Sequence, residues 1–307
     1  MSPKKDLLGI ETLSVKEITQ YLDLADRFAA VLERPIPIVP SLRGKTILTL
    51  FFEPSTRTQI SFSIAAKRLS ADIVNFSQVT SSVGKGETLL DTAKNIEAMK
   101  VDGVVVRHVA PGAAKFLAEK LNAFIINAGD GGHEHPTQAL LDLMTMRQHF
   151  SEFKNLKVLI VGDIEHSRVA RSNIYGLNTL GAKVAICAPP TLVPLNIEKL
   201  GAKVFYNLDD IIGDFDVVMA LRIQLERQDT GLFPSIREYR TLYGLTKERV
   251  GRMKPGSIVM HPGPTNRGIE IDPDVADSDK SVILTQVKNG VAIRMAVLFI
   301  HCGGRLG

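Results

Sequence analysis

The sequence predicts an α/β protein built from two parallel-sheet domains, with an active site in the cleft between them. Short apolar runs alternate with helical stretches along most of the chain, which is typical of βαβ units and a parallel sheet. The alternation occurs in two series, one that begins at residue 45 and one that follows Asn155. The distinctive polar residues come after strand-like runs, where open parallel sheets bind their ligands.

A helix precedes the first series, which contains four expected strands. Ser14 and Glu17 form a capping box, S-V-K-E, apolar residues then recur at helical spacing, and Pro35 ends the helix. Strands are expected at 46–52, 72–76, 103–107 and 123–127, and helices near 55–70, 87–100 and 112–121. The apolar residues of the helix near 55–70 that we expect to face a core are Ile60, Phe62, Ile64, Ala65 and Leu69.

The second series has a similar rhythm. Its strands are expected at LKVLIVGD (156–163), AKVAIC (182–187), DFDVVMAL (214–221) and GSIVMHPGP (256–264), the last of which runs into a loop, with a helix at 167–180. The helix His135–Phe150 joins the two series, and Val291–Cys302 is apolar nearly all round, as in a buried terminal helix. We therefore place the first domain at residues 1–134 plus 291–307 and the second at 135–290, with 135–150 as an interdomain helix.

Composition and charge exclude several classes of protein. The 307 residues carry a net charge of +4, but the basic residues are spread along the chain, which disfavours a nucleic-acid partner. No apolar segment approaches the ~20 residues of a membrane span, and the N-terminus has no hydrophobic signal region. We expect a cytoplasmic protein without a membrane partner, in which Cys187 and Cys302 are buried thiols rather than a disulfide framework.

The segment FFEPSTRT (51–58) predicts an anion site at a helix N-terminus. It follows an apolar strand, and Ser55-Thr56-Arg57-Thr58 open the next helix. Backbone N–H groups are unpaired there and the helix dipole is positive, so three hydroxyls and a guanidinium suit a phosphate. The alternative is a Ser/Thr N-cap beside a chance arginine, but a cap needs one hydroxyl, whereas four consecutive donors favour the anion site.

Other strand ends and one loop carry further polar residues. The strand ends of the first series contribute Arg107, His135 and Gln138, and those of the second series contribute Arg168, Arg222, Gln224 and HPGP (261–264). The loop SSVGKGET (81–88) adds Lys85 between two glycines. A Walker A loop and a G-x-G-x-x-G fingerprint are both absent from the sequence, which argues against nucleotide hydrolysis and dinucleotide binding.

The triplet His133-Glu134-His135 has a spacing that can ligate zinc. A cysteine or a second carboxylate cluster at ligand spacing does not accompany it, and His135 stands directly before Pro136 at the start of a helix. We therefore expect neither a metal nor a cofactor.

Several motifs together resemble those of the carbamoyltransferases over nearly the whole chain. FFEPSTRT, VVVRH, HPTQALLDL, GDIEHSR, RIQLER and HPGP occur in the order and at the spacings of that superfamily, which transfers a carbamoyl group from carbamoyl phosphate to an amine. RIQLER (222–227) and HPGP are similar to the aspartate carbamoyltransferase family. The ornithine enzymes instead carry a cysteine-containing HCLP and an SMG-type loop. The resemblance implies synthesis of N-carbamoyl-L-aspartate for pyrimidines.

The resemblance also implies a role for each matching residue. The phosphate would be held by Ser55, Thr56, Arg57 and Thr58. Arg107 would bridge phosphate and carbonyl, His135 and Thr58 would bind the carbonyl oxygen, and Gln138 the carbamoyl amide. Aspartate would be bound by Arg168, Arg222, Gln224 and Lys85, and the carbamoyl amine would face the loop of Gly263 and Pro264. Glu53 and Arg227 would orient the arginines. Ser82 and Lys85 would come from the neighbouring subunit of a trimer.

Two departures from the family pattern and two alternatives remain open. One lysine precedes Gly86 where some relatives have two, and Gly263 stands where many have a larger apolar residue.

The first alternative is an ornithine carbamoyltransferase-like enzyme, whose cationic acceptor the Arg168 and Arg222 pair would repel. The second is a non-catalytic two-lobed anion-binding protein, which would have no use for His135 and Gln138. A regulatory chain or another pyrimidine-pathway enzyme is a further conceivable partner.

Overall fold

The computed structural model describes residues 4–77, 88–223 and 235–303 and divides the chain into two compact units. Unit 1 comprises residues 1–141 and 288–307, and unit 2 comprises residues 142–287. Two helices, α5 (Pro136–His149) and α10 (Ile283–His301), each begin in one unit and end in the other.

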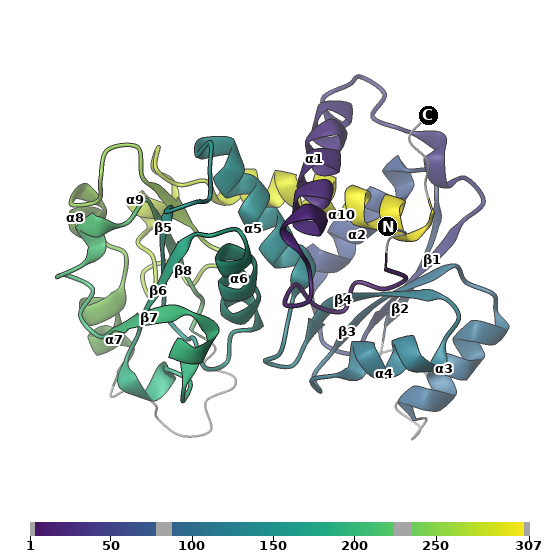
Figure 1. Cartoon of the computed structure of the whole chain (residues 1–307), viewed down its shortest axis with the longest axis horizontal. Helices are drawn as coiled ribbons and strands as arrows, with labels where there is room; N and C mark the ends of the chain where they lie inside the picture. Colours follow the sequence, from purple (N-terminus) through teal and green to yellow (C-terminus); the bar gives the residue numbers. More distant parts are fainter. Residues whose placement is uncertain (1–3, 78–87, 224–234, 304–307) are drawn as a thin grey trace. The chain divides into compact units, whose positions relative to one another are not determined.

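Unit 1 is built on a parallel sheet of four strands in the order β2-β1-β3-β4 (Figure 1). The strands are β1 (Thr46–Phe51), β2 (Asp72–Ser77), β3 (Gly103–His108) and β4 (Phe124–Asp130). The helices are α1 (Val15–Leu32), α2 (Thr56–Arg68), α3 (Leu89–Ala98) and α4 (Ala113–Lys120), with a short 3₁₀ helix at Pro40–Leu42. Aliphatic side chains of β1, β3 and β4 pack with α3 and α4 in one buried core.

Unit 2 contains a parallel sheet of five strands in the order β7-β6-β5-β8-β9. The strands are β5 (Lys157–Val161), β6 (Lys183–Cys187), β7 (Ala202–Phe205), β8 (Val217–Ala220) and β9 (Ile258–Met260). The helices are α6 (Arg168–Thr179), α7 (Ile236–Tyr243), α8 (Lys247–Gly251) and α9 (Pro273–Ala276), with 3₁₀ helices at Pro190–Leu192, Ile197–Leu200 and Ile212–Asp214.

Each sheet contains one point at which the order of the strands reverses. In unit 1, the chain passes from β1 to β2 on one side and continues through β3 and β4 on the other. In unit 2, β5 is followed by β6 and β7 on one side, whereas β8 and β9 lie on the other. At such a point, the connections that follow the two central strands run to opposite sides, which opens a crevice at the carboxyl ends of these strands.

The structure confirms the predicted pair of parallel sheets and most of the expected elements. The capping box is present, because the Glu17 amide donates to Ser14 Oγ at 3.2 Å and the Ser14 amide donates to Glu17 Oε2 at 2.8 Å. Two inward-facing assignments in α2 are wrong: Ile60 and Ile64 are 52% and 37% exposed. The sheet covers only one side of this helix, so its outer face remains open.

The terminal helix is longer than the apolar run predicted. It begins at Ile283 rather than near Val291, and by length and composition it is apolar enough to cross a membrane. This corrects the expectation that no segment approaches that length. Of the 18-residue apolar window in this helix, 67% is buried inside the structure, as in the core helix of a soluble protein. At its end, His301 Nδ1 lies 2.9 Å from the Lys5 carbonyl, which ties the helix to the N-terminal segment.

The two cysteines differ in exposure. Cys187 lies in β6 and is fully buried, and burial raises the pKa of its thiol to about 12. Cys302 is half-buried, so the prediction of a buried thiol is confirmed for Cys187 and only in part for Cys302. Burial also raises the pKa of Cys302 to about 12, and both thiols therefore stay protonated near neutral pH.

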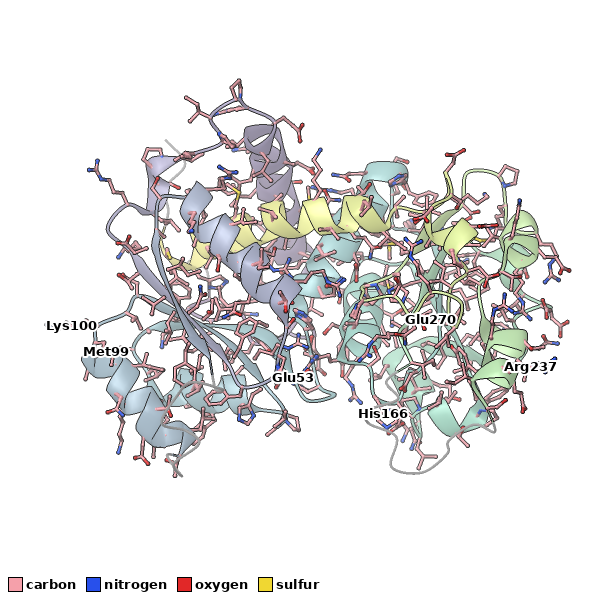
Figure 2. The ribbon with its side chains drawn as sticks, turned by 180° about the vertical axis from the view of Figure 1, so that it is seen from behind. Glu53, Met99, Lys100, His166, Arg237 and Glu270 are labelled. Carbon is pink, nitrogen blue, oxygen red and sulfur yellow. The ribbon has the colours of Figure 1, made fainter. Side chains whose placement is uncertain are left out.

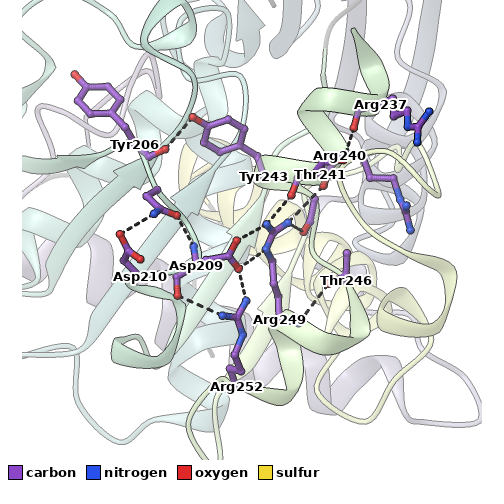
Figure 3. A network of polar contacts seen from close by, with 12 residues as sticks. Tyr206, Asp209, Asp210, Arg237, Arg240, Thr241, Tyr243, Thr246, Arg249 and Arg252 are labelled. Atoms are coloured by element: carbon purple, nitrogen blue, oxygen red, sulfur yellow. Dashed lines mark hydrogen bonds and ion pairs between the residues drawn. The ribbon is translucent and has the colours of Figure 1, made fainter.

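A polar network around Arg249 fixes the end of α7 in unit 2 (Figure 3). The guanidinium donates to Asp209 Oδ1 and Oδ2 at 2.9 and 2.7 Å, and to the carbonyls of Thr241 and Gly244 at 2.7 and 2.8 Å. Arg252 pairs with the same carboxylate. Arg249 thereby satisfies carbonyls that α7 leaves without intrahelical partners. Hydrogen bonds from Arg249, with a smaller contribution from Arg252, hold the pKa of Asp209 well below its usual range.

We expect Asp209→Asn to lower the free energy of unfolding by about 1–2 kcal/mol at neutral pH, because it leaves the buried Arg249 with a neutral partner. The Asp209 pKa is depressed in the folded state, so its stabilisation is fully present above the unfolded value of about 4 and is lost as the pH falls further. Urea denaturation should therefore show a difference between wild type and variant that shrinks below about pH 4. An equal difference at pH 7 and pH 3 would contradict this account.

Candidate active site

The N-terminus of α2 carries the predicted anion-binding residues of unit 1. The helix begins at Thr56, five residues after β1 ends, and Ser55 occupies the N-cap position. The Ser55 side chain makes no capping hydrogen bond, so a Ser/Thr cap does not account for this hydroxyl. Thr58 is buried, whereas Thr56 and Arg57 are exposed. The segment therefore presents side-chain donors and backbone N–H groups at the positive end of a 13-residue helix.

Arg107 lies next to this helix end because β3 is the sheet neighbour of β1. Its Cα is in register with that of Phe51, and the Phe52 amide donates to the Arg107 carbonyl at 2.8 Å. The guanidinium is 2.8 Å from Glu53 Oε1, and it also donates to the Ala128 carbonyl at 3.3 Å. Both side chains of the pair are mostly buried, so Glu53 (labelled in Figure 2) holds Arg107 at the strand-order reversal of unit 1.

The turn that leads from β4 into α5 positions His135 and Gln138. Both side chains are buried. The backbone N–H of Gln138 donates to the backbone carbonyl of His135 at 3.0 Å. Buried carboxylates hold the turn from two sides. Glu134 accepts from the Ile10 amide at 2.8 Å, and Asp130 accepts from the Gly112 amide at 2.7 Å.

The Asp130 carboxylate is the partner of His133, one of the two histidines with metal-like spacing. Burial raises the pKa of Asp130, but hydrogen bonds from His133, Asn127 and Gly112 outweigh it, so the pKa is lowered overall. His133 Nδ1 lies 3.1 Å from Asp130 Oδ2. Within the described residues, no group of three His, Cys, Asp or Glu side chains is placed to hold a metal ion.

Two arginines flank the strand-order reversal of unit 2. Arg168 is the first residue of α6, which follows β5, and its side chain is buried. Arg222 comes two residues after β8 ends and is half-buried. Because β5 and β8 are adjacent parallel strands, both guanidinium groups belong to the same edge of the sheet.

A buried carboxylate supports the connection that carries Arg168. Asp163, fully buried after β5, accepts from the backbone amide of His166 at 3.2 Å and lies 2.9 Å from its ring Nδ1. His166 is labelled in Figure 2. The turn closes with Ser167, whose hydroxyl accepts from the Ala170 amide at 3.1 Å and caps α6. The cap and the Asp163 contacts together fix where α6, and with it Arg168, begins.

The HPGP segment follows β9, the neighbour of β8, at the same edge. The Gly263–Pro264 peptide bond is cis, and Gly263 has a φ of 68°, in the left-handed region that favours glycine. The Gly263 amide donates to His261 Nδ1 at 2.7 Å. Pro264 is exposed.

Four predicted site residues lie outside the described part of the chain: Ser82, Lys85, Gln224 and Arg227. Their roles stay predictions. The other predicted residues fall into two groups, one in each unit. The group of unit 1 is Glu53, Ser55, Thr56, Arg57, Thr58, Arg107, His135 and Gln138, and that of unit 2 is Arg168, Arg222, Gly263 and Pro264.

Sequence reasoning did not find the buried carboxylates behind these residues. Asp130, Asp163 and Glu270 are at most 2% exposed, and each contacts the segment that carries a predicted site residue. The signal that was available for Asp130 and Asp163 is an acidic residue at the end of an apolar strand, where burial without partners would be costly.

The two groups have different chemistry. Unit 1 combines a helix N-terminus, cations, hydroxyls and an imidazole, which suits a phosphate attached to a carbonyl group. Unit 2 presents two guanidinium groups at one sheet edge, which suits a ligand with two carboxylates because arginine binds carboxylates bidentately.

Family models match both units. The model described as aspartate/ornithine carbamoyltransferase, carbamoyl-P binding domain, matches residues 5–148, and the Asp/Orn binding domain model matches residues 154–301. Among curated relatives, the aspartate carbamoyltransferase catalytic subunit of Halothermothrix orenii is 57% identical over 300 residues, which cover 98% of this chain and 96% of the relative.

Solved structures of two enzymes share the fold. Aspartate transcarbamoylase from Trypanosoma cruzi, in complex with carbamoyl phosphate and aspartate, matches with a TM-score of 0.86 and 28% identity over 96% of this chain and 94% of that one. Ornithine carbamoyltransferase from Pyrococcus furiosus matches with a TM-score of 0.85 and 28% identity over 98% of both chains. The fold is thus common to enzymes with different acceptors.

We expect Arg107→Ala to weaken binding of inorganic phosphate by about 10-fold or more, because a charge-assisted hydrogen bond is worth ~1.5–3 kcal/mol. Glu53→Gln should weaken it less, since the arginine remains but loses its anionic partner. Isothermal titration calorimetry at fixed ionic strength measures both. Arg43→Ala is the control, because Arg43 is an exposed arginine of unit 1 outside the site. A similar loss in the Arg43 variant would mean that phosphate responds to overall charge and not to this site.

Proposed function

Because the chain belongs to the aspartate/ornithine carbamoyltransferase family, we propose that it transfers the carbamoyl group of carbamoyl phosphate to the amine of L-aspartate. The products are N-carbamoyl-L-aspartate and phosphate. The observation that carries the choice of aspartate is the pair of guanidinium groups, Arg168 and Arg222, on either side of the strand-order reversal in unit 2. Two cations at one sheet edge match an amine that bears two carboxylates.

Carbamoyl phosphate is bound by unit 1 in this proposal. Its phosphate takes the N-terminus of α2, where Ser55, Thr56 and Thr58 supply hydroxyls and Arg57 supplies charge. Arg107, held by Glu53, contacts both the phosphate and the carbonyl group. Because the leaving phosphate is a dianion, cations and a helix N-terminus at this position stabilise the charge that develops as the bond to the carbamoyl carbon breaks.

The remaining residues of unit 1 act on the carbamoyl group. Attack by an amine places negative charge on the carbonyl oxygen, and Thr58, Arg107 and His135 are the donors that stabilise it. Gln138 binds the carbamoyl amide. The donors to the carbonyl oxygen and the Gln138 side chain also favour an enzyme over a pure anion-binding protein, since phosphate binding alone does not need donors to a carbonyl group.

The acceptor amine must be uncharged when it attacks. Arg168, Arg222 and Gln224 bind the aspartate carboxylates, which fixes the amine for attack on the carbonyl carbon. The departing phosphate accepts the proton that the amine loses, so no dedicated protein base is required. The backbone carbonyls around Gly263 and Pro264 face the carbamoyl amine, and Arg227 orients the arginines.

The two guanidinium groups decide between aspartate and ornithine. Ornithine carries a second ammonium group where aspartate has a carboxylate, and the Arg168 and Arg222 pair would repel it. The fold itself does not distinguish the two, so the choice rests on the residues of unit 2 and on the identity to the aspartate enzymes.

We infer that the working form is a homotrimer in the cytoplasm that serves pyrimidine biosynthesis, with Ser82 and Lys85 completing the site of the neighbouring subunit. Exposed apolar side chains support self-association. Ile60 and Ile64 on the outer face of α2 and Val74 on the edge strand β2 are 52%, 37% and 51% exposed. A second copy of the chain would cover these apolar side chains. Trimers or assemblies of trimers would also offer surfaces to a regulatory chain or another enzyme of the pathway.

Purified protein should carbamoylate L-aspartate and leave L-ornithine unused. Release of phosphate from carbamoyl phosphate, with product identification by mass spectrometry, measures this directly. Turnover should survive exhaustive chelation, since no step needs a metal. Comparable rates with ornithine, or no reaction with aspartate, would refute the assignment.

Arg222→Gln should raise the KM for aspartate by about 10-fold or more, because it removes a charge-assisted contact to a carboxylate. The dissociation constant of phosphate should stay unchanged, because the phosphate residues belong to unit 1. Arg237→Gln is the matched control, since Arg237 is an exposed arginine of unit 2 outside the site. If Arg222→Gln weakened phosphate and aspartate equally, the division of substrates between the units would be wrong.

Mixed trimers test the shared site. Arg57→Ala and Lys85→Ala should each be nearly inactive alone, because each removes a cation that faces the leaving phosphate. When the two proteins are dissociated and reassembled together, a site that takes Arg57 from one chain and Lys85 from its neighbour is intact, and activity should return. Native mass spectrometry establishes that subunits have exchanged. Exchange without recovered activity would show that Lys85 does not complete a neighbour's site.

A further inference from the structure

A buried histidine–carboxylate pair lies behind the HPGP segment in unit 2. His261 and Glu270 are each 1% exposed, and His261 Nε2 is 3.2 Å from Glu270 Oε1. Glu270, labelled in Figure 2, lies beyond the segment, nine residues after the histidine. None of the roles proposed above uses either side chain.

The hydrogen bonds determine which tautomer the histidine adopts. The Gly263 amide donates to His261 Nδ1 at 2.7 Å, so Nδ1 must present a lone pair. In the neutral ring the proton is then on Nε2, which donates to Glu270. A protonated Nδ1 would face the N–H of Gly263, two donors with no acceptor between them.

The same carboxylate also organises the backbone that leaves the turn. Glu270 Oε1 accepts from the Asn266 amide at 2.5 Å, and the Asn266 side chain donates to the Ile223 carbonyl at 3.3 Å. Ile223 directly follows Arg222. A continuous series of hydrogen bonds thus connects Gly263 in the turn after β9 with the segment after β8 that carries Arg222.

We propose that His261 and Glu270 are positioning residues that hold the Gly263–Pro264 turn and the Arg222 segment in the geometry needed for carbamoyl transfer. This inference rests on the proposed function, because it assigns the pair to the part of the site that binds aspartate. Glu270 fixes the ring as the Nε2–H tautomer, and the ring in turn supplies the acceptor that holds the Gly263 amide. Neither side chain contacts a substrate, so their effect is exerted through the backbone of the turn.

Two substitutions of His261 separate the two hydrogen bonds. In His261→Asn, Oδ1 lies near the position of Nδ1 and can accept from the amide two residues later, as asparagine does in turns. In His261→Gln, the longer amide can reach Glu270 but offers no acceptor close to its own backbone. If the turn is positioned through Gly263, His261→Gln should lower kcat/KM for aspartate by about 10–100-fold, while His261→Asn should stay within about threefold of wild type.

Glu270→Gln tests the pair in both backgrounds. The amide oxygen can still accept from His261 and from the Asn266 amide, but it carries no charge, so both contacts weaken and kcat/KM for aspartate should fall. In the His261→Asn background the same change should cost less, because only the contact to the Asn266 amide remains. All variants should keep the wild-type affinity for inorganic phosphate. Asp209→Asn controls for stability, because it weakens unit 2 without contacting the turn and should leave kcat/KM unchanged.

The tautomer is also measurable without turnover. Protein labelled with ¹⁵N-histidine should show, near neutral pH, a neutral Nε2–H ring whose signal disappears in His261→Asn and shifts in Glu270→Gln. The positioning role is overturned if His261→Asn and His261→Gln lose kcat/KM for aspartate equally, if the Glu270→Gln loss is the same in both backgrounds, or if the His261 ring carries its proton on Nδ1. If wild type does not carbamoylate aspartate, the proposed function fails, and the NMR result still decides whether the pair holds the turn.

Discussion

The candidate site residues of each unit depend on one topological constraint, the reversal of strand order in its parallel sheet. At β1 and β3 in unit 1, and at β5 and β8 in unit 2, the connections leave adjacent strands in opposite directions. Side chains at these carboxyl ends are not covered by a crossing helix, so they remain available to a ligand. Arg107 lies at the end of β3, and Glu53, Arg168 and Arg222 follow β1, β5 and β8, so each reaches the crevice of its own sheet because of where its strand lies in the order.

A second principle is that each site segment is held by a buried or mostly buried acidic group. Glu53 pairs with Arg107, Asp130 and Glu134 support the turn before His135, Asp163 fixes the connection to Arg168, and Glu270 holds the turn after β9. A carboxylate in an apolar setting is costly unless backbone N–H groups or cations satisfy it. An alternative conformation of such a loop would leave its carboxylate without these partners. The cost of doing so holds the loop, and the site residue that it carries, in one conformation.

The alternation of strands and helices, the two sheets and the strand-end residues could be predicted from the sequence. Hydrophobic periodicity, capping residues and short motifs are local signals, and these features depend on them. The capping box at Ser14 is an example. Ile60 and Ile64 were misplaced because a helical apolar pattern does not reveal which side the sheet covers. The supporting pairs were not predicted either. Arg107 and Glu53 are 54 residues apart and Asp209 and Arg249 are 40 apart, and only the tertiary fold brings such partners together.

In the proposed function, acceptor choice and carbamoyl binding are carried by separate sets of residues, and this separation has a consequence for how the family diversifies. The donor groups proposed for phosphate and carbonyl belong to unit 1, with their own supports in Glu53, Asp130 and Glu134. The groups proposed for the acceptor belong to unit 2, where Asp163 and the His261–Glu270 pair provide independent support. Changes in unit 2 can therefore replace a dicarboxylate acceptor by a cationic one without disturbing the chemistry of the carbamoyl donor. The shared fold of enzymes with different acceptors is the expected result.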